Sequence, residues 1–158
     1  MRSRNTILKL ALDDKIQYDT DMNMVSQKPK PIPLTMTICD GIIDDRLSGK
    51  KSLIGIFNNI AVMELPCQHQ TLYVYCVLTE GLGQYDGALR CTHLESNKTI
   101  INITGPISFP NPLATVEFIF DIKNMVLEHE GIYVFELLCD NQPVISRKIN
   151  VAKIKPKK

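Results

Sequence analysis

Apolar and polar residues alternate along most of the chain, which is the pattern of β-strands that bury one face. The alternation is cleanest in residues 115–122, where every second side chain is apolar and is predicted to face a core: Val116, Phe118, Phe120 and Ile122. Successive side chains of an extended chain point to opposite faces, so the residues between them are predicted to face outward. This segment is therefore predicted to be a half-buried strand.

The last long apolar segment, residues 130–139, shows the same alternation, with Tyr133, Phe135 and Leu137 on one side. The polar triplet 140–142 then reverses the chain, and residues 143–151 supply a second apolar edge. Together these residues predict a β-hairpin with one face in the core.

About seven to eight such strands are predicted, with turn-forming residues between them and no convincing helical periodicity. Their expected positions are residues 34–39, 52–57, 72–79, 88–94, 98–103, 115–122, 130–139 and 143–151. A series of short strands of this kind is typical of an antiparallel sandwich or barrel.

Two segments call for separate interpretation. Residues 52–57 are nearly all apolar and include Gly55, which suits a central strand covered on both faces, or a strand whose backbone is closely approached at the glycine. Residues 105–112 contain three prolines and are predicted to be irregular.

Both ends of the chain differ from the middle. Residues 1–33 are predicted to form an N-terminal arm, with a short amphipathic helix at 7–16 and a proline-rich linker. Residues 34–152 form the sandwich domain and 153–158 a basic tail, and Met22 or Met24 is an alternative first residue. The candidate partner contacts in the two ends are Lys28, Pro29, Lys30, Pro31, Lys155, Lys157 and Lys158.

The charge and cysteine content exclude several classes of protein. The formal net charge is +1, so no whole-chain field favours nucleic acid. No segment has the roughly 18 unbroken apolar residues of a membrane helix. Five scattered cysteines form no disulfide framework, which predicts reduced thiols in an intracellular protein.

Two stretches resemble known proteins. Residues 127–135 resemble the tyrosine corner of immunoglobulin-like domains, with Gly131 and Tyr133 at the corner and Phe135 where disulfide-bearing members have Cys. Residues 39–45 and 49–57 are similar to the opening of a bacterial family of small uncharacterised β-sandwich proteins. The likeness covers residues 34–152. It implies a β-sandwich fold and a bacterial origin, and no activity. Together with the tyrosine corner and the reduced thiols, it predicts an immunoglobulin-like β-sandwich in the bacterial cytoplasm.

The clearest candidates for metal ligands are two Cys-x-His pairs, Cys67 with His69 and Cys91 with His93. Four such ligands are able to form a tetrahedral zinc site, although their spacing differs from the usual pairs and Cys91 also suits a buried strand position. The sequence contains no nucleophile elbow and no phosphate-binding glycine loop, so neither an enzyme nor a cofactor is predicted.

These observations favour a non-catalytic subunit that binds another protein in a homo- or hetero-oligomeric assembly. The sandwich edges and the N-terminal arm are the expected contact surfaces, because an exposed edge readily accepts a strand from another chain. The alternative is a module for a small ligand or carbohydrate, which would use loops and the exposed rings of Tyr73, Tyr75 and Tyr85.

Overall fold

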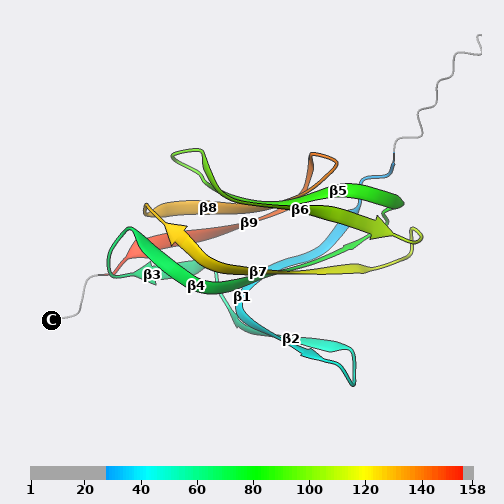
Figure 1. The fold of residues 1–158 in the computed structure, drawn as a ribbon, viewed down its shortest axis with the longest axis horizontal. Coiled ribbons are helices and arrows are strands. Elements are labelled where there is room, and N and C mark those ends of the chain that lie inside the picture. Colours follow the sequence, from blue (N-terminus) through cyan, green and yellow to red (C-terminus); the bar gives the residue numbers. More distant parts are fainter. Residues whose placement is uncertain (1–27, 155–158) are drawn as a thin grey trace, which may run out of the picture.

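The computed structural model describes residues 28–154, which form nine strands and no helix. The strands are β1 (Ile32–Asp45), β2 (Lys50–Ile56), β3 (Asn59–Val62), β4 (Cys67–Thr79), β5 (Gly83–His93), β6 (Lys98–Phe109), β7 (Val116–Leu127), β8 (Gly131–Cys139) and β9 (Gln142–Lys153). Two stacked layers are visible in Figure 1. The predicted all-β sandwich is therefore confirmed.

The two layers are a four-stranded sheet in the order β2-β1-β4-β7 and a five-stranded sheet in the order β3-β9-β8-β5-β6. All neighbouring strands are antiparallel except β3 and β9, which are parallel. The edge strands β6 and β7 belong to different sheets but lie one above the other (Figure 1).

The core lies between the sheets and is built by alternation. Leu72, Val74 and Cys76 of β4 face Leu89 and Leu137 of the opposite sheet within one cluster of buried side chains. The predicted inward side of β7 is correct, since Ile122 is buried and Val116, Phe118 and Phe120 pack against this cluster. Removing these side chains from water is the main force that holds the sheets together.

The closing hairpin has the predicted form. Tyr133, Phe135 and Leu137 are buried along one side of β8. Asp140 and Asn141 join β8 to β9, with φ angles of 49° and 63°. Positive φ at both central residues is the geometry of the two-residue turn that matches strand twist, and Asp and Asn tolerate it better than most residues.

Three details of the strand prediction are wrong. Nine strands replace the expected seven to eight, because the short β3 was not predicted. Strand β6 continues through the expected irregular region as far as Phe109. Pro106 is tolerated there because β6 is an edge strand, where a missing N–H costs no ladder bond on the free side.

The third error concerns β2, which is an edge strand and is exposed over most of its length. Its apolar residues do not mark a central strand. The other predicted reason for Gly55 agrees with the structure: its φ is 65°, and an added Cβ would lie 2.5 Å from a carboxylate oxygen of Asp40.

Candidate functional site

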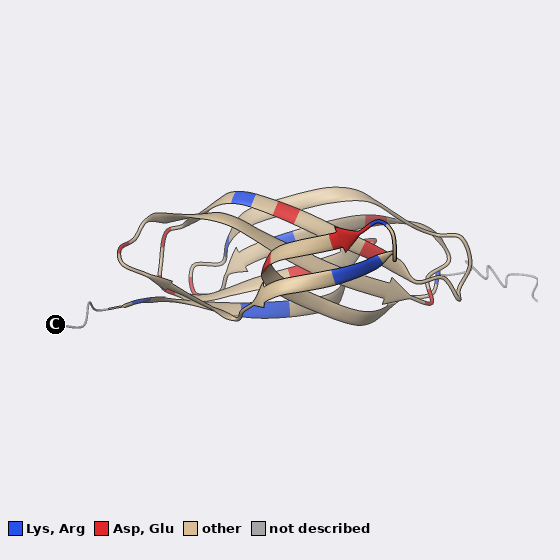
Figure 2. Ribbon diagram, turned by 90° about the horizontal axis from the view of Figure 1, so that it is seen from below, with Lys and Arg blue, Asp and Glu red and all other residues tan. Residues whose placement is uncertain are grey.

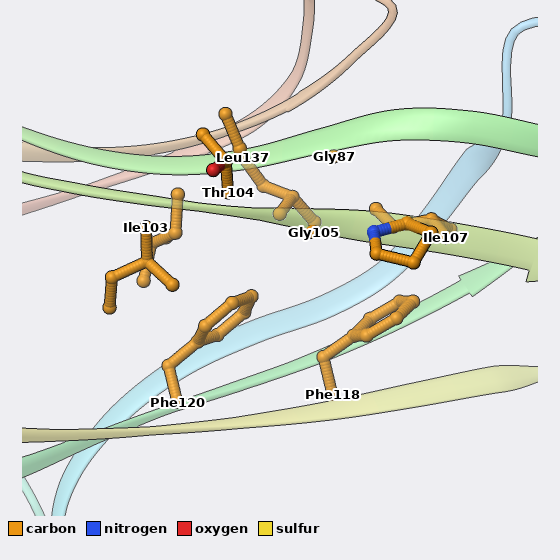
Figure 3. A pocket seen from close by; sticks show the side chains of 11 residues that line it. Gly87, Ile103, Thr104, Gly105, Ile107, Phe118, Phe120 and Leu137 are labelled. Atoms are coloured by element: carbon orange, nitrogen blue, oxygen red, sulfur yellow. The ribbon is translucent and has the colours of Figure 1, made fainter.

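A hollow opens between the two sheets where β6 and β7 lie one above the other. We call it the edge cleft and define it by Ile103, Gly105 and Ile107 of β6, Phe118 and Phe120 of β7, and Leu137 of β8 (Figure 3). Gly105 occupies an inward position of β6, and no heavy atom lies within 4 Å of the place where its Cβ would be. The missing side chain leaves a cavity of about 90 Å³.

The walls of the edge cleft are apolar. The rings of Phe118 and Phe120 lie 6.4 Å apart, at an angle of 27° between their planes, and Ile103 remains 38% exposed although it points inward. No titratable side chain lines the cavity. The cleft is therefore suited to holding an aliphatic group, and its lining contains no titratable acid or base.

Both strands beside the cleft have a free edge. Among the described strands, β6 pairs only with β5, and β7 pairs only with β4. Every second N–H and C=O of such a strand points away from its sheet. A chain that approaches the cleft would thus meet backbone hydrogen-bonding groups as well as apolar walls.

A second feature is the hairpin formed by the end of β1 and by β2. Strand β1 pairs with β4 only as far as Cys39, and its continuation pairs with β2 alone. Residues 40–56, which we call the β1–β2 arm, project from the sandwich (Figure 1). The arm carries four exposed aliphatic side chains, with these exposed fractions: Ile43 55%, Leu47 100%, Ile54 50% and Ile56 60%.

The arm has two different faces. Asp44 and Lys51 are cross-strand partners on the face that turns toward the four-stranded sheet, where Lys51 Nζ lies 2.7 Å from a carboxylate oxygen of Glu117 on β7. Ile43 and Ile54 occupy alternate positions and point to the opposite face. The apolar face of the arm is thus turned away from its own domain.

Charge is distributed without a region of one sign. Figure 2 shows Lys and Arg interspersed with Asp and Glu along the strands. This agrees with the net charge of +1 and gives no support to a phosphate-binding surface.

The two Cys-x-His pairs are not brought together into one site. Cys67 and His69 lie on β4, whereas Cys91 and His93 lie on β5 of the other sheet. Within residues 28–154, no group of three or more His, Cys, Asp or Glu side chains is placed to hold a metal ion. The Nε2 atom of His69 is buried without a hydrogen-bond partner, and its ring packs 5.9 Å from that of Phe57.

His93 belongs instead to a polar network that the sequence did not reveal. Its Nδ1 lies 2.8 Å from Ser96 Oγ, and its Nε2 lies 3.0 Å from the carbonyl oxygen of Glu130 and 2.7 Å from a carboxylate oxygen of Glu95. These partners assign the ring proton to Nε2, which donates to Glu130, while Nδ1 accepts from Ser96.

The order Ser96, His93, Glu95 is that of a nucleophile, a base and an orienting carboxylate. However, the His93 ring is buried and lies 4.8 Å from the Tyr133 ring and 5.5 Å from the His129 ring. The network thus joins the β5–β6 turn to the start of β8.

The residues of the predicted corner lie at this same end. The hydroxyl of Tyr133 donates to the carbonyl oxygen of His129 at 2.9 Å and accepts from the His129 N–H at 3.3 Å. Gly131 has a φ of 119°, and a Cβ there would overlap the carboxylate of Glu95. Phe135 is fully buried in the core. All three residues support the fold.

The thiols of Cys39, Cys76, Cys91 and Cys139 are unsuited to nucleophilic chemistry. All five are free, and burial raises the pKa of Cys76 and Cys91 to about 12 and that of Cys139 to about 11. Burial also raises the pKa of Cys39. These thiols stay protonated at neutral pH, whereas the thiolate is the reactive form.

The described part of the linker contacts its own domain. Lys28 Nζ donates to the carbonyl oxygen of Gln84 at 2.5 Å and pairs with Asp140 at 3.0 Å, and Pro31 is buried. Pro29 accepts a hydrogen bond from Tyr85, and Lys30 is exposed beside the same hollow. The other predicted contacts lie outside the described residues: Lys155, Lys157 and Lys158, together with the helix expected at 7–16.

The tyrosines differ from the expectation in one case. Tyr85 is only 2% exposed, because its ring packs edge-on against Phe109 at 5.7 Å and beneath Lys28. Its hydroxyl donates to the Pro29 carbonyl at 2.7 Å and accepts from the Leu82 N–H at 3.0 Å. The predicted exposed ring at Tyr85 is therefore wrong. Tyr73 and Tyr75 are half-buried at alternate positions of β4, and burial raises the pKa of Tyr75.

The fold and the cleft define an all-β sandwich domain with an open edge. The chain belongs to the family of unknown function DUF6941, whose model matches residues 34–152. The expected membership of an uncharacterised family is thus confirmed. No curated protein matches the sequence. Within residues 28–154 there is no helix long and apolar enough to cross a membrane.

Proposed function

We propose that this protein is a non-catalytic subunit that binds another protein in a larger assembly, through the β1–β2 arm and the sandwich edges. The observation that carries the proposal is the arm itself, which exposes Ile43, Leu47, Ile54 and Ile56 on a two-stranded projection. An isolated two-stranded hairpin is marginally stable in water, so a partner that covers the apolar face would stabilise it.

The gain from covering this face is appreciable. Fully burying an Ile or Leu side chain contributes about 1.5–3 kcal/mol, so each half-exposed isoleucine of the arm would add about 1 kcal/mol on binding. Leu47 would add about twice that amount because none of its side chain is covered. These contributions are of the size found for important residues at protein interfaces.

We further propose that the sandwich is immunoglobulin-like and that the protein works inside a bacterial cell. The hydrogen bond from Tyr133 to His129, four residues upstream, supports the first part because it is the tyrosine-corner contact. Five unpaired thiols support a reducing compartment, and the bacterial setting depends on the resemblance described above.

The proposal is tested by making the arm polar and leaving the sandwich intact. The double variant Ile54→Glu/Ile56→Glu changes two exposed side chains, and Leu94→Glu is the control because Leu94 is also about half exposed but lies in the β5–β6 turn. Each protein is isolated from its native cells under gentle conditions, and the proteins recovered with it are quantified by mass spectrometry.

We expect the wild type and Leu94→Glu to recover the same partner in the same ratio, and the arm variant to lose it. Equal recovery with all three proteins, at unchanged unfolding midpoints, would show that the arm is not the binding element.

A further inference from the structure

The hollow of the edge cleft and the side chain of Leu47 on the β1–β2 arm match in size and in apolar character. The cleft holds a cavity of about 90 Å³ open at its mouth, whereas the tip of the arm presents Leu47 with its side chain fully exposed. An enclosed apolar cavity of about 150 Å³ takes a benzene molecule, so the smaller, open hollow suits one branched aliphatic side chain. A leucine has this size and chemistry.

The tip is held in one conformation before any contact is made. The Asp45 carboxylate accepts hydrogen bonds from the Leu47 N–H at 3.0 Å and from the hydroxyl of Ser48, and the Asp45 carbonyl accepts from the Gly49 N–H at 2.8 Å. These bonds fix the turn that presents Leu47. A fixed turn loses little conformational entropy on docking.

The arm is also long enough to reach another molecule. Strand β1 continues for six residue positions beyond Cys39, the last residue that pairs with β4, and ends at Asp45. At about 3.3 Å per residue these positions span about 20 Å before the turn that carries Leu47. Figure 1 shows the arm projecting from the sandwich, so this length is directed outward.

The tip of the arm is basic on balance, because Arg46, Lys50 and Lys51 outnumber Asp44 and Asp45. Arg46 and Lys50 form no ion pair among residues 28–154. The face of β7 opposite to the cleft phenylalanines carries the exposed carboxylates of Glu117 and Asp121. Glu117 already pairs with Lys51, and Asp121 pairs with Lys123 at 3.2 Å, but both carboxylates remain open to solvent and to a further cation.

We propose that the β1–β2 arm of one copy docks in the edge cleft of a second copy, placing Leu47 in the hollow beside Gly105 and joining copies head to tail. This inference rests on the proposed function and names the partner as the same chain. The arm and the cleft are different surfaces, so the contact is heterologous and leaves one free arm and one free cleft at the ends of every assembly.

Two substitutions separate the two surfaces. Leu47→Asp removes the docking side chain at a fully exposed position, and its control is Leu94→Asp. Gly105→Val fills the hollow from within, where an added Cβ meets no atom within 4 Å, and its control is Ser108→Val on the outward side of the same strand. Gly105 and Ser108 do not have the positive φ that only glycine adopts readily.

The measurement is sedimentation velocity of the full chain over a wide range of protein concentrations. We expect the wild type and both controls to form dimers and longer chains as the concentration rises, and each docking variant to associate at least tenfold more weakly. An equimolar mixture of Leu47→Asp and Gly105→Val should form dimers and nothing larger, because it contains one working arm and one working cleft per pair.

Three results would overturn the inference. A wild type that stays monomeric at about 1 mM excludes self-docking. Association of Gly105→Val at the wild-type strength excludes the edge cleft as the receptor, and a mixture that stays monomeric excludes a head-to-tail contact. In each case the native partner experiment still decides separately whether the arm binds another protein.

Discussion

The substitution Tyr133→Phe tests whether the corner at the start of β8 stabilises the sandwich. It removes one oxygen atom and leaves the ring, which is buried and lies 4.8 Å from the ring of His93. The hydrogen bond that the hydroxyl donates to the His129 carbonyl, at 2.9 Å, is lost, together with the longer one of 3.3 Å that it accepts from the His129 N–H. The change therefore isolates hydrogen bonding from packing.

The expected loss follows from the two bonds. A protein hydrogen bond contributes about 0.5–1.5 kcal/mol net, and the longer bond belongs at the lower end of that range. His129 is exposed, so we expect water to replace the hydroxyl at its backbone groups in the variant. We therefore expect the free energy of unfolding to fall by about 1–2 kcal/mol.

The assay is urea unfolding followed by far-ultraviolet circular dichroism, since the chain has no tryptophan. With a slope of about 2 kcal/mol per molar urea, the middle of the range for small proteins, the midpoint should fall by about 0.5–1 M at an unchanged slope. Tyr73→Phe is the matched control, because Tyr73 is half-buried and its hydroxyl makes no hydrogen bond among the described residues. A loss below about 0.5 kcal/mol in Tyr133→Phe, or an equal loss in the control, would refute the reasoning.

Three further outcomes are expected. Burial raises the pKa of Cys76 and Cys91 to about 12 and that of Cys139 to about 11, so the folded state keeps protons that unfolded thiols release above about pH 8.5. The contribution of these thiols to the free energy of unfolding is therefore full below about pH 8.5 and falls as the pH rises toward 11. In urea unfolding, Cys76→Ala should make this fall shallower by about 1.4 kcal/mol per pH unit. Gly55→Ala, with a φ of 65° and Asp40 against the new Cβ, should loosen the β1–β2 arm in hydrogen exchange more than Gly49→Ala, which has a φ of 69° and open space. His93→Ala should cost about 2–4 kcal/mol in thermal or urea unfolding, whereas the exposed His129→Ala should cost less than about 0.5 kcal/mol.

The sequence predicts those parts of the fold in which local pattern and tertiary environment agree. Residues 115–122 and the closing hairpin show a period of two, and each buries the predicted face. The network around His93 could not be found in this way, because Glu130 lies 37 residues from His93 and only the pairing of β5 with β8 brings them together. The sequence His-x-Glu-Ser in a turn was its single local sign.

The prediction failed where apolar residues are exposed instead of buried. Residues 52–57 read as a central strand because a run of Leu and Ile usually lies inside a protein. In the structure this run is exposed, since β1 leaves the sheet after Cys39 and carries β2 with it. The edge cleft was not predicted for a related reason. Gly105 was assigned to a proline-rich irregular segment, whereas it occupies an inward position of a continuous strand.

The two sheets differ in how their edges are protected, and the difference favours association through the four-stranded sheet. The five-stranded sheet ends in β3, which has only four residues, and in β6, where Pro106 interrupts the row of donors. Short strands and edge prolines are features that hinder pairing with another chain. The four-stranded sheet ends in β2 and β7, which contain no proline, and these are the strands that carry the exposed isoleucines and the cleft phenylalanines. Strand β2 starts with Lys50 and Lys51, so the uncharged part of its edge is residues 52–56. A contact that joins β2 of one copy to β7 of the next would cover both proline-free edges at the same time, whereas a contact between like edges would leave the other kind of edge exposed.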